Sequence, residues 1–285
     1  MTILCIDGMN FLHRARAGWG MGGAPVIFNF MRNFRSLVEK FSPNRVYFVL
    51  EGRSRKRRQL LPEYKANRVV EQGTQKHEEM NRFFEQATEV TSLLSTCFPI
   101  SVIRHPEYEC DDTIYNLIKR STSAIEWTVV SNDSDFTQLL NEFQHVKLYN
   151  PMLKSYVETP DYDYVTWKSL RGDGSDNIPG IPGVGDKTAL QTVLDPDLLE
   201  TLLSDPDKGK IFTRNYELIK FMEWTDEDAA EMICSSPQKN WEKVHQVFQG
   251  HGFNSLLKES AWKKFMDTFN PLFGDQQFIS PGNKA

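Results

Sequence analysis

Apolar and polar positions along the first 160 residues predict strands and helices in turn. Short apolar runs predict four strands, at Thr2–Asp7, Arg45–Glu51, Ile100–Arg104 and Glu126–Ser131. Apolar residues spaced three or four apart predict helices at Val26–Phe41, Gln75–Phe98 and Glu109–Arg120, and a further helix that starts at Phe136–Leu140. Because strands and helices alternate, we expect an α/β fold with a mostly parallel central sheet flanked by helices.

The pattern changes near Pro160. Residues 145–157 predict a β-hairpin at the edge of the sheet, whereas beyond them strand signals disappear and helical patches continue to about Phe269. We therefore expect an α/β core at residues 1–170 and a helical C-terminal region at 171–285. A chain of 285 residues is long enough for one large domain or a core with a smaller addition.

Composition narrows the class of protein. At 40% hydrophobic and 25% charged, the chain reads as an ordinary globular protein of the cytoplasm. No apolar run reaches 18 residues and the N-terminus lacks the pattern of a signal peptide, so we expect no membrane span. The four cysteines are far apart, which argues against a disulfide framework or a zinc site.

A basic segment interrupts a chain whose net charge is −5. Residues 53–68, RSRKRRQLLPEYKANR, hold seven lysines or arginines and a single acid, Glu63. Such a run is either a solvated charged loop or a contact for nucleic-acid phosphates.

Nine carboxylates are expected on one rim of the predicted sheet. They follow the predicted strands or open the helical region: Asp7, Glu51, Glu109, Asp111, Asp112, Asp133, Asp135, Asp173 and Asp176. One such acid could be a helix cap, but the combination at successive strand ends lies where parallel sheets bind ligands. Because like charges raise one another's pKa, cations are needed. Carboxylate ligands favour Mg²⁺ or Mn²⁺, and this many indicate two ions, which suits phosphodiester chemistry.

The stretch GDGSDNIPGIPGVGDKTAL, at 172–190, nearly matches a phosphate-binding P-loop. Gly180 and Gly185 have the required spacing, but Asp186 intervenes before Lys187. A P-loop follows a strand, and the nearby prolines argue against one here. The glycines instead allow close backbone approach, and the amides at the start of the next helix can bind a phosphate.

Five motifs in this order resemble the 5′-nuclease family. They are IDGMN (6–10), LPEYKANR (61–68), ECDD (109–112), SNDSDFTQL (131–139) and GDGSDNIPGIPGVGDKTA (172–189). The family includes flap endonucleases, the 5′–3′ exonuclease domain of bacterial DNA polymerase I and phage exonucleases, and the resemblance is greatest to the ribonuclease H of T-even phages. It covers most of residues 1–190.

The resemblance implies two Mg²⁺ sites, in which Mn²⁺ could substitute. The first would be held by Asp7, Glu51, Glu109 and Asp111, with Asp112 nearby. The second would be held by Asp133, Asp135 and Asp176, with Asp173 nearby. Glu51 departs from the family pattern, which usually has Asp here and a spacer one residue longer before its Tyr-Lys pair.

The resemblance also implies DNA contacts. Residues 53–90 would form a helical arch for a free 5′ end, where Lys65 and Arg68 approach the scissile phosphate and Tyr64 stacks on a base. Five basic residues would hold the strand backbone: Arg53, Arg55, Lys56, Arg57 and Arg58. The glycine-rich stretch would be a helix–hairpin–helix element that also holds a K⁺ ion and contacts duplex DNA through Gly180, Gly183, Gly185, Lys187 and Thr188.

The implied function is metal-dependent 5′–3′ exonuclease and flap endonuclease activity, with ribonuclease H activity on RNA primers, in DNA replication. Asp133 and Asp135 would be catalytic together with Lys65 and Arg68. The implied partners of this monomer are branched or flapped DNA, RNA–DNA hybrid and a single-strand DNA-binding protein. Two alternatives stay open: an inactive DNA-junction-binding protein, and a PIN-type ribonuclease, which shares the acids but lacks the glycine-rich hairpin.

Overall fold

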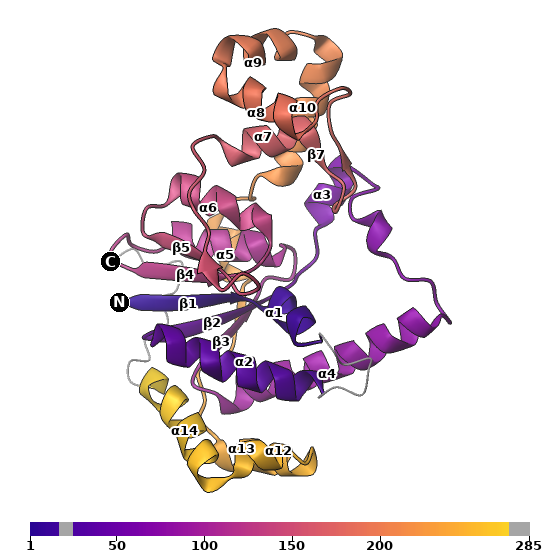
Figure 1. Ribbon diagram of the computed structural model, residues 1–285. Helices are drawn as coiled ribbons and strands as arrows, with labels where there is room; N and C mark the ends of the chain where they lie inside the picture. Colours follow the sequence, from indigo (N-terminus) through magenta and orange to yellow (C-terminus); the bar gives the residue numbers. More distant parts are fainter. Residues whose placement is uncertain (17–24, 274–285) are drawn as a thin grey trace.

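A seven-stranded sheet lies at the centre of the computed structural model, which describes residues 1–16 and 25–273 (Figure 1). The strand order is β6-β5-β4-β1-β2-β3-β9. The strands are β1 (Thr2–Asp7), β2 (Arg45–Leu50), β3 (Ser101–Arg104), β4 (Glu126–Val130), β5 (Val146–Asn150), β6 (Ser155–Tyr156) and β9 (Ile233–Cys234). Strands β1 to β5 are parallel, and β6 and β9 are antiparallel edge strands. The predicted mostly parallel sheet and its edge hairpin are confirmed.

Helices cover both faces of the sheet because side chains alternate along each strand. Leu4 and Ile6 of β1 belong to the core beneath α1 (Gly8–Ala15), α2 (Val26–Phe41) and α4 (Gln75–Cys97). Ile3 and Cys5 face the opposite core, which α5 (Cys110–Lys119) and α6 (Thr137–Glu142) cover. The predicted bounds of α4 and α5 agree with the structure to within about two residues and those of α2 are identical, whereas α1 was not predicted.

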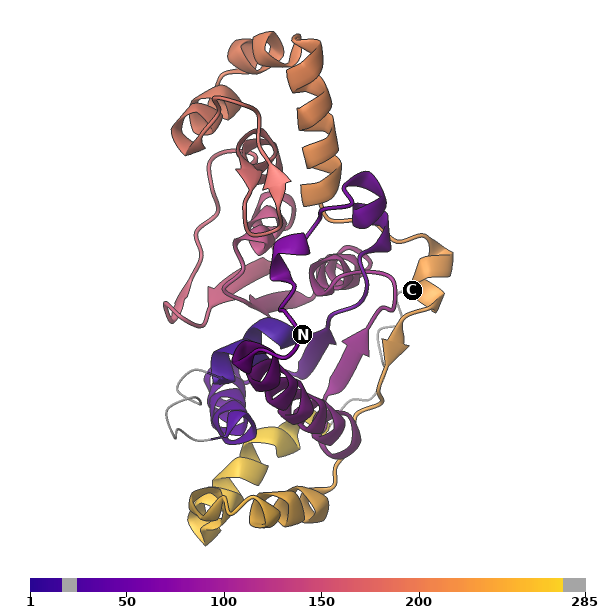
Figure 2. The same cartoon turned by 90° about the vertical axis from the view of Figure 1, so that its right-hand side faces the viewer.

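The basic segment connects β2 to α4. It forms α3 (Arg55–Leu60) and a 3₁₀ turn, η2 (Ala66–Arg68), before α4 begins. Figure 2 shows this segment crossing in front of the sheet, on the side where the parallel strands end. Residues 61–74 therefore lie over the rim on which the acids were expected.

The prediction that strands end near Pro160 is wrong. The hairpin strands β7 (Gly172–Asp173) and β8 (Ile178–Pro179) pair with each other, and β9 extends the main sheet beside β3. Each is two residues long, which is too short to leave a periodic signal in the sequence.

The helices after residue 160 lie at two ends of the molecule. One lobe contains α7 (Tyr164–Arg171), α8 (Asp186–Leu194), α9 (Pro196–Leu203) and α10 (Pro206–Ile219). After α11 (Asp226–Ala230), the chain runs along the edge of the sheet through β9 to α12 (Trp241–Gly250), α13 (Asn254–Leu257), α14 (Glu259–Phe269) and η4 (Asn270–Phe273), at the opposite end (Figures 1 and 2). Residues 274–285 of the expected helical region lie outside the described residues. Among the helices described, none has the length and apolar character that a membrane crossing requires.

Candidate metal centre and nucleic-acid interface

The ends of β1 and β4 hold the acids at the centre of the rim. Asp7 caps α1, where its Oδ1 accepts from the amide of Asn10 at 3.1 Å, and its Oδ2 accepts from the hydroxyl of Ser131 at 2.8 Å. Asp133 caps the 3₁₀ turn η3 (Ser134–Phe136) and accepts from the amide of Asp135 at 3.0 Å. These local caps fix the carboxylates at the strand ends.

Two groups of convergent carboxylates are found among the described residues. Ligand oxygens of Glu109, Asp111 and Asp112 lie within 4.8 Å of one another, as do those of Asp135, Asp173 and Asp176. The first group stands at the start of α5. The second group combines Asp135 of η3, which precedes α7, with Asp173 and Asp176 of the β7–β8 hairpin, which follows α7. Such sets of hard oxygen donors fit Mg²⁺ or Mn²⁺.

Asp7, Glu51 and Asp133 lie next to these groups. Glu51 follows β2, and its Oε2 accepts from the amide of Cys110 at 3.2 Å, which brings it to the start of α5. Burial, the nearby Glu109 and then Asp7 raise the pKa of Glu51 to about 7. Burial also raises the pKa of Asp7 to about 6, and the charge of Asp133 adds to the rise. The structure thus places these three acids on the same rim.

The shifts within the two groups depend on the cations nearby. Burial, followed by the charge of Asp112, raises the pKa of Asp111 well above its usual range. For Asp173, burial is outweighed by the hydrogen bond and charge of Lys168, and its pKa falls to about 2. Asp135 pairs with the same lysine, but burial outweighs that charge and raises the pKa of Asp135.

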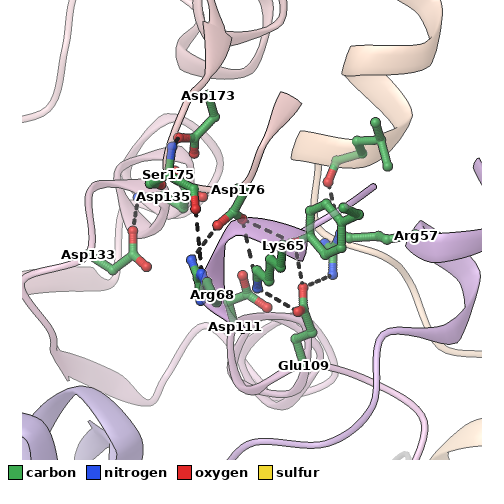
Figure 3. A network of polar contacts seen from close by, with 12 residues as sticks. Arg57, Lys65, Arg68, Glu109, Asp111, Asp133, Asp135, Asp173, Ser175 and Asp176 are labelled. Atoms are coloured by element: carbon green, nitrogen blue, oxygen red, sulfur yellow. Dashed lines mark hydrogen bonds and ion pairs between the residues drawn. The ribbon is translucent and has the colours of Figure 1, made fainter. Parts of the chain in front are cut away.

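Besides Arg57, three cationic side chains lie against the carboxylates, and Figure 3 shows two of them, Lys65 and Arg68. Lys65 Nζ is 2.5 Å from Glu109 Oε1 and 3.7 Å from Asp176 Oδ2, so it bridges the two groups. Arg68, which was expected near the scissile phosphate, pairs with Asp176, a predicted ligand of the second metal. Lys168 pairs with Asp135 and lies 2.7 Å from Asp173 Oδ2. These nitrogens neutralise the oxygens that a bound cation would otherwise neutralise.

Lys168 was missed at the sequence level. It is 4% exposed, on the buried face of α7 and one helical turn from the buried Tyr164. A lysine at a position that helical spacing assigns to the core was the available signal, because lysine is almost never fully buried without a partner.

The expectation that Arg57 holds DNA backbone is wrong. Its side chain is 2% exposed, and all five guanidinium N–H groups have acceptors inside the protein. It forms a bidentate pair with Asp112, at 2.6 and 2.8 Å, and contacts Glu109 Oε2 at 2.7 Å. Asp112 also accepts from the amide of Met222 at 2.8 Å, so this acid is the counter-charge of Arg57 rather than a free metal ligand.

The expectation that Tyr64 stacks on a base is also wrong for this conformation. Its ring is 4% exposed and packs with Leu61 and Ile178. Its hydroxyl lies 2.9 Å from Glu109 Oε2 and 3.1 Å from Asp176 Oδ2. The hydroxyl of Tyr64 therefore contacts one carboxylate of each group.

A basic cleft of about 690 Å³ opens beside the first group of acids. Its lining includes Arg53, Arg55, Arg58, Lys65 and Arg68, together with Glu51 and Glu109. Arg53 and Arg58 are exposed and make no side-chain ion pair with the described residues, whereas Arg55 pairs with Glu107 at 3.2 Å. Lys56 lies elsewhere, against the hydroxyl of Tyr108. Three of the five expected backbone contacts thus share one cleft.

The glycine-rich stretch forms the β7–β8 hairpin and the loop that leads into α8. A Cβ on Gly180 would lie 2.1 Å from the carbonyl oxygen of Arg171, so this glycine is required by packing inside the protein. Gly183, with φ of +81°, and Gly185 would meet nothing within 4 Å. Lys187 and Thr188 are exposed in the first turn of α8. Of the expected DNA contacts in this stretch, those from Gly183 onward therefore lie on open surface, whereas Gly180 does not.

Two groups of carboxylates stand on one rim of a parallel sheet, beside a basic cleft, and this arrangement fits metal-dependent phosphodiester chemistry. Residues 2–168 match the family described as 5′-3′ exonuclease, N-terminal resolvase-like domain. This match covers more than half of the chain, and the chain belongs to this family of 5′ nucleases. The PIN-type alternative is thereby set aside.

Curated relatives agree with this assignment. DNA polymerase I of Bacillus subtilis is 32% identical over 61% of this chain and 22% of its own length. The 5′-3′ exonuclease of Aquifex aeolicus is 27% identical over 90% of this chain and 94% of its own. The chain thus spans under a quarter of the first of these relatives and nearly all of the second.

Solved structures share the fold. The T5 D15 protein co-crystallized with metal ions superposes with a TM-score of 0.65, at 18% identity, over 95% of this chain and 99% of that protein. The catalytic core of Rad2 in complex with a DNA substrate has a TM-score of 0.54, at 14% identity, over 95% of this chain and 92% of that core.

Proposed function

We propose that this chain hydrolyses phosphodiesters at 5′ ends and 5′ flaps during DNA replication, and removes RNA primers annealed to DNA. The observation that carries the proposal is the pair of carboxylate groups bridged by Lys65 and bordered by the basic cleft. Metal-dependent chemistry on phosphates needs clustered oxygen ligands, and a nucleic-acid strand needs cations beside them.

The rim acids would hold two divalent ions, Mg²⁺ or Mn²⁺. Asp7, Glu51, Glu109 and Asp111 would form the first site, and Asp133, Asp135 and Asp176 the second, with Asp173 completing its shell. Such ions, when bound, lower the pKa of water and offset charge on a phosphate under attack. Asp112 would contribute indirectly, because its pair with Arg57 holds α3 against the start of α5.

The cations of the segment from α3 to α4 would act on the DNA. Lys65 lies between the two acid groups and Arg68 lies beside the second, where a phosphate that accumulates charge would accept hydrogen bonds from them. Arg53, Arg55 and Arg58 would contact the strand that leads to the 5′ end. This supports residues 53–90 as an arch over a free end.

The lobe would hold the duplex. Gly183, Gly185, Lys187 and Thr188 present an open backbone and the start of a nine-residue helix, a suitable site for a duplex phosphate. We assign this segment as the helix–hairpin–helix element, with a K⁺ ion on its carbonyls. The protein would work as a monomer in the cytoplasm, including that of a phage-infected cell, alongside a single-strand DNA-binding protein.

End-labelled flap, nicked and RNA–DNA hybrid substrates test the proposal, each with and without Mg²⁺. We expect Mg²⁺-dependent products that carry a 5′-phosphate, and equal resistance of all three substrates in excess chelator. Binding of the flap junction without cleavage in Mg²⁺ or Mn²⁺ would instead support the alternative of an inactive junction-binding protein.

A further inference from the structure

A second pocket lies between α3 and the end of α10 and has no role in the proposed chemistry. This α3–α10 pocket has a volume of about 470 Å³, which is within the range of small-molecule sites. Figure 1 shows α3 next to the end of α10, and Arg57 joins the two elements. Arg55 and Arg58 of α3 line the basic cleft, whereas Lys56 and Leu60 line the pocket. The helix α3 therefore separates the pocket from the cleft.

The floor of the α3–α10 pocket is held by hydrogen bonds that connect it to the first group of acids. Arg57, the partner of Asp112, donates through Nε to the carbonyl of Leu218 at 2.8 Å. The amide of Met222 donates to Asp112 Oδ1, also at 2.8 Å. Phe221 belongs to the core beneath α5 and α6. A ligand therefore meets a surface that is already formed, which lowers the entropic cost of binding.

Three polar side chains of the pocket are available to a ligand. Gln59, Glu217 and Lys220 make no side-chain hydrogen bond or ion pair with the described residues, although the Lys220 ammonium lies 5.7 Å from the centre of the Tyr216 ring. Gln59 offers both a donor and an acceptor, Glu217 accepts and Lys220 donates. The pocket thus presents every kind of hydrogen-bonding group.

The charges of the pocket favour a ligand that carries both a phosphate and hydroxyl groups. Lys56 and Lys220 are the two cations of its lining. Glu223 pairs with Lys119 at 2.5 Å, which leaves Glu217 as the lining acid without an ion pair among the described residues. Lysine binds phosphate as a point charge, and a carboxylate accepts hydrogen bonds from ribose hydroxyls.

The apolar part of the lining suits a nucleobase. Leu60 of α3 is 47% exposed, and Met222 is half-buried on the opposite side of the lining, in the segment after α10. Gln59 stands next to Leu60 and can pair with the edge of a base through its amide. Apolar, hydroxyl-binding and phosphate-binding groups in one pocket together match a nucleotide.

We propose that the α3–α10 pocket binds the 5′-terminal ribonucleotide of an RNA primer, an inference that rests on the proposed function for its substrate. Lys56 and Lys220 contact the terminal phosphate, and the base packs against Leu60 and Met222. Glu217 accepts from the ribose 2′-hydroxyl, the group by which proteins distinguish RNA from DNA. A helix is about 10–12 Å across, so a strand in the basic cleft reaches the pocket across α3 within a few nucleotides.

The test uses three RNA–DNA hybrids of one sequence, each with four unpaired nucleotides at the 5′ end of the RNA. The terminal nucleotide is a 5′-phosphorylated ribonucleotide, a 5′-phosphorylated deoxyribonucleotide, or a ribonucleotide without the phosphate. Ca²⁺ replaces Mg²⁺, so that binding is measured without cleavage. We expect wild type to bind the first hybrid about tenfold more tightly than either of the others, as one charge-assisted hydrogen bond allows.

Two variants assign these preferences to the pocket. Lys220→Ala should abolish the preference for the phosphate, and Glu217→Ala should abolish the preference for the ribonucleotide. Lys210→Ala and Glu200→Ala are the matched controls, since they remove an exposed lysine of α10 and an exposed glutamate of α9, and both should keep the two preferences. A photoactivated 4-thiouridine at the 5′ terminus should crosslink to α3 or to residues 217–223.

Equal affinity of wild type for the three hybrids would overturn the inference. Preferences that survive in both pocket variants, or crosslinks confined to other segments, would overturn it as well. If wild type shows the preferences in Ca²⁺ but cleaves no hybrid in Mg²⁺ or Mn²⁺, the proposed function fails and this inference stands. If it cleaves all three hybrids and shows no preference, this inference fails and the proposed function stands.

Discussion

Arg57 and Arg58 are neighbours in a six-residue helix, and the fold gives them opposite environments. Arg57 points into the protein against Glu109 and Asp112, whereas Arg58 lines the open cleft. The basic run could be identified from sequence, but not which arginine turns inward, because a helix this short carries no usable periodicity. The buried position of Tyr64 was hidden for a similar reason, because Tyr64 lies in a turn between α3 and η2.

This pair makes a matched stability test. Arg57→Ala leaves the buried carboxylate of Asp112 without its cation, so we expect the free energy of unfolding in urea to fall by about 3–5 kcal/mol. Arg58→Ala removes an exposed charge and should change it by about 0.5 kcal/mol or less. Equal values for the two variants would contradict the assignment of Arg57 as an internal counter-ion.

Lys65 lies between both acid groups, and its proposed role is on the reacting phosphate. In single-turnover cleavage, Lys65→Ala should slow the reaction by about a hundredfold or more, because a fixed cation there offsets charge that develops during the reaction. Junction affinity in Ca²⁺ should change only severalfold. Lys187→Ala is the contrasting variant, with weaker duplex binding and a nearly normal rate at saturating DNA. A Lys65 variant that altered affinity alone would rule out the role.

At the scale of elements, the long helices and the parallel strands were predictable because each repeats its pattern over several turns or residues. The short pieces were not: β7, β8 and β9 have two residues each. These pieces nevertheless matter to the site, since the β7–β8 hairpin brings Asp173 and Asp176 to Asp135. The candidate acids could be found because strand ends converge in a parallel sheet, but their grouping into two sets of three required the hairpin's position.

Two glycines of this hairpin region are expected to have different roles, Gly180 in packing and Gly185 in duplex binding. Gly180→Ala forces a Cβ to within 2.1 Å of a backbone oxygen, so the backbone must shift, and we expect a loss of about 1–3 kcal/mol. Gly185→Ala meets open space and should leave stability nearly unchanged while it weakens duplex binding. Thermal unfolding of the two variants decides the point, and a Gly185 variant as unstable as the Gly180 variant would contradict it.

At the scale of the whole molecule, folding concentrates negative charge on one rim of a chain that also carries a basic segment. Without bound cations, Asp7 and Glu51 hold protons in the folded state that the unfolded chain has already released, since their pKa values are about 6 and about 7. Their contribution to stability is therefore full at low pH and is lost as the pH rises through these values.

We accordingly expect the protein in chelator to lose stability between about pH 5 and about pH 7.5, with a Tm lower by a few degrees at the higher pH. Added Mg²⁺ binds the folded state and should raise the Tm, more at the higher pH, because the ionised acids bind it better. Calorimetry at both pH values, with and without Mg²⁺, measures this. A Tm in chelator that rises over the same range would contradict the sign of these shifts.

The central claim is that the rim acids bind the metals of a 5′ nuclease, and cleavage by single carboxylate variants tests it most directly. Asp111→Asn and Asp133→Asn each remove one charge from a different proposed site, and Glu158→Gln removes an exposed acid away from both. On a 5′-labelled flap in Mg²⁺, we predict that the two rim variants lose cleavage by roughly a thousandfold or more while junction binding in Ca²⁺ stays within severalfold. The Glu158 variant should behave as wild type. Cleavage by either rim variant at close to the wild-type rate would contradict the account.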